Sequence, residues 1–176
     1  MKIVDEILSM VETISFKTKK LKKYEKILYK TVISFYMKQL GVNNITINVF
    51  SERSKNGIGS ITLSDIVDKE YKMYVDFTMG FDQVFEAIAH EMTHIKQISK
   101  KELVKKGDEV FWKNKLFLSV ADFKKANKTL ASHGKMPFEK EAKDNAEVLR
   151  KQFIGSREFK NLAKEDPTLA FIIDNT

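Results

Sequence analysis

The sequence predicts a single α+β domain. Apolar residues recur every three to four positions in some segments and alternate with polar residues in others, and no linker or internal repeat divides the chain. The 176 residues suit one domain, and a hydrophobic content of 43% is enough for a core. We therefore expect residues 1–176 to fold as one unit, with a helical N-terminal extension over 1–42 and a core that carries the chemistry over 71–154.

The N-terminal half is expected to contain helices followed by a small sheet. Helical spacing of apolar residues predicts helices over 2–14 and about 19–40, with Gly41 as the C-cap of the second. Alternation then replaces this spacing, and it predicts strands at 45–49, 61–67 and 71–77. These strands would form a small mixed or antiparallel sheet.

The C-terminal half returns to helical spacing. It predicts a helix over 81–105, a hairpin over 109–120 that turns at Lys113-Asn114, and helices near 120–131 and 138–154. The last residues are expected to form a short helix and a tail.

Composition excludes several classes of protein. The absence of cysteine rules out a disulfide scaffold, a cysteine-ligated zinc finger, an iron–sulfur cluster and a thiol nucleophile. No apolar run is long enough to cross a bilayer, and Asp5 and Glu6 interrupt the pattern that a signal peptide needs. We expect a cytoplasmic protein without a membrane partner.

The net charge of +7 is concentrated near the N-terminus. Residues 1–40 hold nine lysines and four acidic residues, and residues 17–23 are the densest part. Clustered lysines can bind nucleic acid through its phosphates, so a nucleic-acid partner is one hypothesis. The other is a solvated helix face. It is favoured because 28 of the 31 basic residues are lysine, whereas base-specific contacts favour arginine.

The motif with the clearest chemistry is His90-Glu91-Met92-Thr93-His94, which has the form H-E-x-x-H. Histidines four residues apart lie above one another on a helix, so both can bind one metal ion. The glutamate beside the first histidine can then hold a water on the open side of the metal.

The helix around this motif is expected to be covered on two sides. At about 100° per residue, the apolar stripe lies nearly opposite the two histidines. That stripe consists of Phe81, Val84, Phe85, Ile88, Met92 and Ile95. A core should therefore lie behind the helix, and a second element should partly bury the histidines.

A catalytic zinc site needs a third protein ligand. The pattern H-E-x-x-H-x-x-G-x-x-H fails, because Gln97 and Lys100 replace the glycine and the third histidine. The helix over 138–154 offers Glu141 on one edge of its buried stripe, with Asn145 one turn later as its partner. Glu139 lies on the other edge and is the main competitor, and His133 is the remaining histidine.

HEMTH, the Trp112 hairpin and the run Pro137-Phe138-Glu139-Lys140-Glu141-Ala142 together resemble small gluzincin-type metallopeptidases, including the compact ones of bacteriophages and mobile elements. The resemblance covers about residues 71–150. It implies a zincin-like fold and one Zn²⁺ ion held by His90, His94 and Glu141, with Glu91 as general base. If the gene belongs to a phage, the location would be the host cytoplasm or the virion. Asn145 stands where thermolysin-like members have an aspartate.

The expected activity is that of a zinc-dependent endopeptidase of narrow specificity, acting on a protein or peptide. Zinc would activate a water, and Glu91 would accept its proton and pass it to the leaving nitrogen. His133, Tyr71 and Tyr74 are candidate oxyanion donors. An extended substrate could pair with the edge of the strand over 71–77.

Two other hypotheses remain. One is a non-catalytic, zincin-like binding domain. The other is a SprT-like protease that acts on DNA-bound proteins, which would give the basic N-terminus a role. His133 follows His94 by 39 positions, which is far more than the gap in that group.

Overall fold

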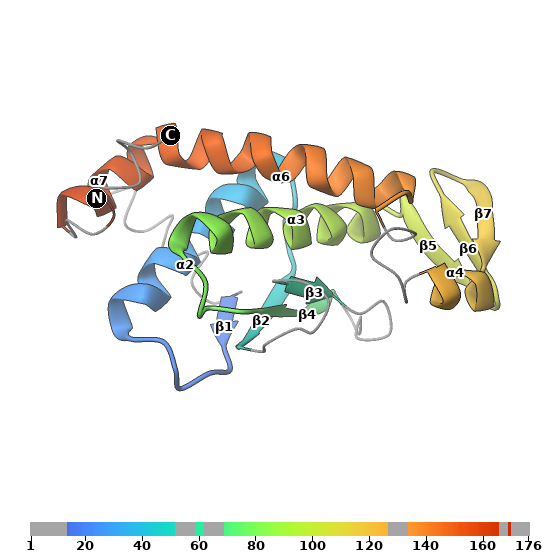
Figure 1. The fold of residues 1–176 in the computed structure, drawn as a ribbon, viewed down its shortest axis with the longest axis horizontal. Coiled ribbons are helices and arrows are strands. Elements are labelled where there is room, and N and C mark those ends of the chain that lie inside the picture. Colours follow the sequence, from blue (N-terminus) through green and yellow to red (C-terminus); the bar gives the residue numbers. More distant parts are fainter. Residues whose placement is uncertain (1–13, 52–58, 62–68, 127–133, 166–168, 170–176) are drawn as a thin grey trace.

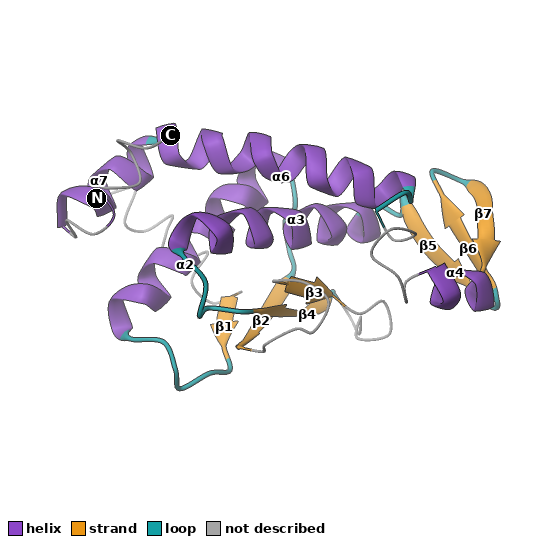
Figure 2. Cartoon of the chain, viewed as in Figure 1, coloured by secondary structure: helices purple, strands orange, loops and turns teal. Residues whose placement is uncertain are grey.

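Two small sheets and five helices make up the described part of the chain (Figures 1 and 2). The structure is a computed structural model that describes residues 14–51, 59–61, 69–126, 134–165 and 169. This arrangement confirms the α+β class. Among the described helices, none combines the length and apolarity needed to cross a membrane.

The larger sheet is mixed, which is one of the two predicted arrangements. It contains β1 (Ile14–Phe16), β2 (Thr46–Ser51), β4 (Glu70–Val75) and β3 (Gly59–Ile61), in that spatial order. The first three are parallel and β3 is antiparallel. Strand β4 is therefore paired with β2 over its whole length and with β3 over residues 73–75. For residues 73–75 this corrects the expectation that a substrate could add to the edge of the strand, because β3 already occupies it.

The N-terminal elements differ in part from the prediction. Ile14, expected at the end of a helix, lies in β1 opposite Ile47, and residues 2–13 are outside the described part. Helix α2 (Lys23–Leu40) follows. The Lys22 amide donates to the Glu25 carboxylate at 2.6 Å at its start. Gly41 ends the helix with a φ of 61°, as predicted, because glycine adopts this left-handed conformation without steric cost.

Two long antiparallel helices, α3 (Phe81–Ser99) and α6 (Pro137–Gly155), pack side by side. Figure 1 shows α3 between the larger sheet and α6. The expected second cover of α3 is therefore α6. The predicted stripe of α3 packs into the main core with side chains of α6 and of α7 (Arg157–Glu165). Phe85 and Phe153, for example, meet edge to face with ring centroids 5.3 Å apart.

Helix α3 ends earlier than predicted. Lys101 has a left-handed φ of 57°, and the chain then enters β5 (Leu103–Lys106) instead of continuing the helix to residue 105. The predicted hairpin is confirmed: β6 (Glu109–Trp112) and β7 (Lys115–Ser119) join at Lys113-Asn114. Both turn residues have positive φ, as a two-residue hairpin loop requires.

A second apolar cluster connects the three-stranded sheet β5–β6–β7 to the start of α6. It consists of Leu103, Val110, Val120, Met136 and Phe138. Trp112 packs on the Phe138 ring at 5.9 Å, so its position supports a packing role. Helix α4 (Val120–Ala126) follows β7. Three predicted segments lie wholly or mostly outside the described residues: the rest of this helix to 131, the strand over 61–67 and the C-terminal tail.

Candidate metal centre

The two histidines of the H-E-x-x-H motif meet on α3 as predicted. His90 and His94 are one helical turn apart, and their Nε2 atoms lie 3.0 Å from each other. The rings are nearly perpendicular, at 82°. Two Nε2 atoms at this separation can bind one cation once both imidazoles are neutral.

Glu139 of α6 completes the cluster. Its Oε2 atom lies 3.2 Å from Nε2 of His90 and 3.4 Å from Nε2 of His94. Three ligands bound tetrahedrally at about 2.0–2.1 Å stand about 3.3 Å from one another. The three side chains therefore fit a small divalent cation such as Zn²⁺, and we call His90, His94 and Glu139 the triad.

Glu141, the predicted third ligand, is placed elsewhere. Its carboxylate accepts hydrogen bonds from Lys96 at 2.8 Å and from Lys113 at 2.7 Å. Burial by itself raises the pKa of Glu141, but these two lysines outweigh it and hold the pKa below its usual range. The carboxylate is thus an ion-pair partner, and the alternative acid, Glu139, stands beside the imidazoles.

The exchange of the two acids has a simple geometric reason. Glu139 and Glu141 are two residues apart, so they point about 200° apart around α6. The same angle separates His94 from Lys96 on α3. When the two helices pack, one acid faces the imidazole and the other faces the ammonium group. Pro137 at the first position of α6 also places Glu139 in the first turn, where the helix dipole stabilises a carboxylate.

Glu91, the proposed base of the motif, is buried, with 4% of its surface exposed. Burial on its own lowers the pKa of the neighbouring His94. A hydrogen bond to Glu139, the negative charges of Glu91 and Glu139, and a hydrogen bond to Gln97 outweigh this effect and raise the pKa to about 9. Two carboxylates thus concentrate negative potential on the imidazoles. A metal ion must displace a proton from His94 at neutral pH, because a ligating histidine is neutral.

Gln97 is a site residue that the sequence analysis missed. It is fully buried, and its Oε1 atom accepts from Nδ1 of His94 at 2.9 Å. Its Nε2 atom donates to the backbone oxygen of Phe138 at 3.0 Å. The Gln97 amide therefore binds Nδ1 of His94, so that Nε2 of this ring is free to bind a metal. The same amide also holds the first turn of α6, which carries Glu139. The available signal was its position three residues after His94, on the same face of α3.

Exchanging Gln97 for leucine is expected to weaken zinc binding about 10- to 100-fold, because both the imidazole and the Phe138 carbonyl lose their partner. A competition titration against a chromophoric chelator measures this affinity. Asn145→Leu is the matched control, since this amide, predicted to assist the third ligand, makes no hydrogen bond to the triad. Equal zinc affinity of Gln97→Leu and the unmodified chain would contradict the role.

His90 is the most exposed member of the triad. The His90 side chain is 27% exposed, compared with 12% for His94 and 8% for Glu139. A cation there would be held from within the protein and reached from the His90 side, as a catalytic site with a free coordination position requires.

The candidate oxyanion donors do not join the triad in the described structure. Tyr71 is buried in the sheet, and burial raises the pKa of its hydroxyl. Tyr74 stacks on Phe50 of the neighbouring strand with ring centroids 5.1 Å apart. His133 is outside the described residues.

No protein-family model matches the chain, and no curated protein or solved structure matches it.

Proposed function

We propose that this chain is a zinc-dependent endopeptidase of narrow specificity, with His90, His94 and Glu139 as the metal ligands and Glu91 as the general base. The observation that carries the proposal is the mutual distance of the three ligand atoms, 3.0 to 3.4 Å, next to a buried glutamate of the H-E-x-x-H motif. A purely structural zinc site is usually closed by a fourth protein ligand, and the partly exposed His90 favours an open one instead.

The triad, Glu91 and Gln97 have different roles in the proposed reaction. A zinc ion held by the triad supplies a Lewis acid and brings a bound water towards a pKa of about 7. Glu91 takes up the proton of the attacking water and delivers it to the nitrogen of the broken peptide bond. Gln97 holds the His94 ring and the first turn of α6, so the ligands keep their spacing without rearrangement.

The gluzincin-type assignment is part of this proposal. It is supported by the order of the ligands along the chain, two histidines on one helix and a glutamate on a later, antiparallel helix. The ligand is then Glu139, two residues before the Glu141-Ala142 pair on which the sequence resemblance relied. We place the activity in the cytoplasm, where narrow specificity would protect other proteins.

Zinc content and cleavage test the proposal together. Protein purified without added chelator is expected to contain about one zinc per chain, since one triad is described. It should cleave a few members of a mixed peptide library, as read by mass spectrometry. 1,10-Phenanthroline should abolish cleavage and added zinc should restore it. Stoichiometric zinc without any cleavage would favour the non-catalytic hypothesis, and the absence of zinc binding would refute both.

A further inference from the structure

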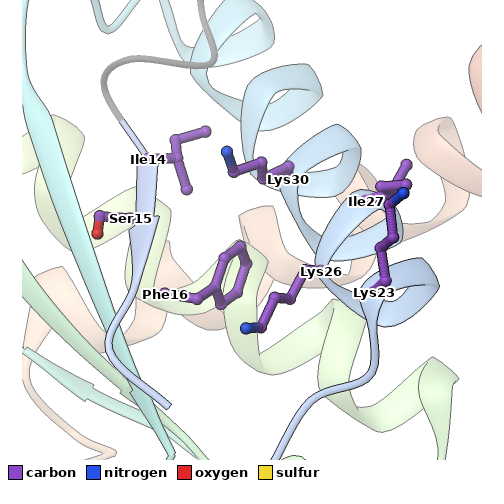
Figure 3. A pocket seen from close by; sticks show the side chains of 7 residues that line it. All are labelled: Ile14, Ser15, Phe16, Lys23, Lys26, Ile27 and Lys30. Carbon is purple, nitrogen blue, oxygen red and sulfur yellow. The ribbon is translucent and has the colours of Figure 1, made fainter. Parts of the chain in front are cut away.

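A lysine-lined cavity lies between β1 and α2, on elements that contribute nothing to the triad (Figure 3). Its volume is about 450 Å³, enough for a few amino-acid residues. Figure 3 shows Ile14 and Phe16 pointing from β1 towards α2, and Lys26 and Lys30 reaching towards them from α2, with Lys23 beside Ile27. The described lining residues are Ile14, Ser15, Phe16, Lys23, Lys26, Ile27 and Lys30.

The charge of this cavity is uncompensated within the described structure. Lys23, Lys26 and Lys30 follow one face of α2 at spacings of three and four residues. None of them forms an ion pair with a described carboxylate, and no described lining residue is acidic. Like charges at these spacings are mildly destabilising, so an anionic occupant would relieve a repulsion that the fold otherwise carries.

The second feature of the cavity is the outer edge of β1. The Lys17 amide donates to the Val49 carbonyl at 2.8 Å, so the backbone groups of Lys17 face β2. In a parallel pair these groups alternate in direction along the strand, and those of Ser15 therefore also face β2. The amides and carbonyls of Ile14 and Phe16 then face away from β2. An outer strand of this kind is a template for one more strand.

We propose that an extended acidic segment of another polypeptide adds to the outer edge of β1 and places alternate acidic side chains against Lys23, Lys26 and Lys30. Lys23 and Lys30 are seven positions apart and therefore span about 10.5 Å of helix, and alternate residues of a strand are about 6.6 Å apart. Two acidic side chains separated by one residue therefore fit within the length of the lysine row. Ile27, with 50% of its surface exposed, offers an apolar contact beside them.

A peptide fits these features better than a nucleic acid. Strand addition uses the backbone N–H and C=O groups of Ile14 and Phe16 in register, and a sugar–phosphate chain has no matching pattern. Base-specific readers also favour arginine, and the described lining contains none. The proposal concerns binding alone and is independent of zinc.

A fluorescent peptide with alternating glutamate and valine is the probe, and fluorescence anisotropy reads its binding to the full chain. The variant Lys23→Glu/Lys26→Glu/Lys30→Glu is expected to lose at least about tenfold in affinity, because it replaces attraction with repulsion. The control Lys140→Glu/Lys143→Glu/Lys160→Glu makes the same charge change at exposed lysines outside the cavity. It should stay within about twofold of the unmodified chain, since none of these three lysines is among the described lining residues.

Backbone pairing has its own measurement, which needs no variant of the chain. Peptide binding should slow hydrogen exchange at the Ile14 and Phe16 amides by at least about tenfold, because they become bonded. Methylation of alternate peptide nitrogens should abolish binding in one of the two possible phases and spare it in the other. Equal loss of affinity in both triple variants, unchanged exchange at Ile14 and Phe16, or lysine-dependent binding of single-stranded DNA but not of the peptide would each overturn the proposal.

Discussion

Glu139→Gln is expected to lower the zinc affinity of the chain by more than about 100-fold, whereas Glu141→Gln should change it less than about threefold. Glu139 contributes its oxygen at 3.2 and 3.4 Å from the two imidazoles, while the carboxylate of Glu141 is bound by Lys96 and Lys113. The amide of glutamine keeps the size of the side chain and removes the charge that a cation requires. Titration of the metal-free proteins with zinc measures both affinities under the same conditions.

A second measurement distinguishes the loss of a metal ligand from unfolding of the variant. Because Glu139 raises the pKa of His94, the metal-free Glu139→Gln chain should titrate His94 at a lower pH than the unmodified chain, by NMR. In Glu141→Gln the His94 pKa should stay near 9, although the ion pairs to two lysines are lost. If Glu141→Gln is the variant that loses zinc, the triad is wrong and the acid predicted from the sequence is the ligand.

Glu91→Gln should retain zinc and lose about 10²- to 10⁴-fold in kcat, the range typical of a missing general base. Glu91 is buried and is not one of the three triad residues, so the metal ligands should remain in place. Steady-state cleavage of a peptide found in the library measures the loss, and metal analysis of the same sample measures the zinc. Glu86→Gln, at a half-exposed position earlier on the same helix, is the matched control.

Three results distinguish the functions at this point. Loss of cleavage with zinc retained, in Glu91→Gln but not in Glu86→Gln, supports the general base. Unchanged cleavage by Glu91→Gln would refute its role while leaving the triad intact. Loss of zinc in Glu91→Gln would mean that the side chain supports the ligands rather than the proton transfer.

The sequence predicted correctly those elements that are determined by residues close together in the chain. The hairpin at Lys113-Asn114, the end of α2 at Gly41 and the apolar stripe of α3 depend on turn chemistry and helical period, and all three were predicted correctly. The pairing of Ile14 with Ile47 depends on a distant strand, and the helical spacing around it therefore misled the prediction.

The same distinction applies to the site. His90 and His94 are close because of one helical turn, which a sequence displays directly. Which glutamate becomes the third ligand depends on how α6 is rotated about its axis relative to α3. Helical spacing alone allows a ligand on either edge of the buried stripe of α6. Lys96 distinguishes the two acids. It lies two residues after His94, and Glu141 lies two residues after Glu139, so Lys96 pairs with Glu141 while His94 faces Glu139.

The triad joins segments that are about 45 residues apart in the chain. With zinc bound as proposed, the ion closes a long loop, and a closure of that length removes much freedom from the unfolded chain. Folded protein then gains stability by mass action as free zinc rises above its dissociation constant. Metal supply would thus govern how long the folded chain survives as well as how fast it works.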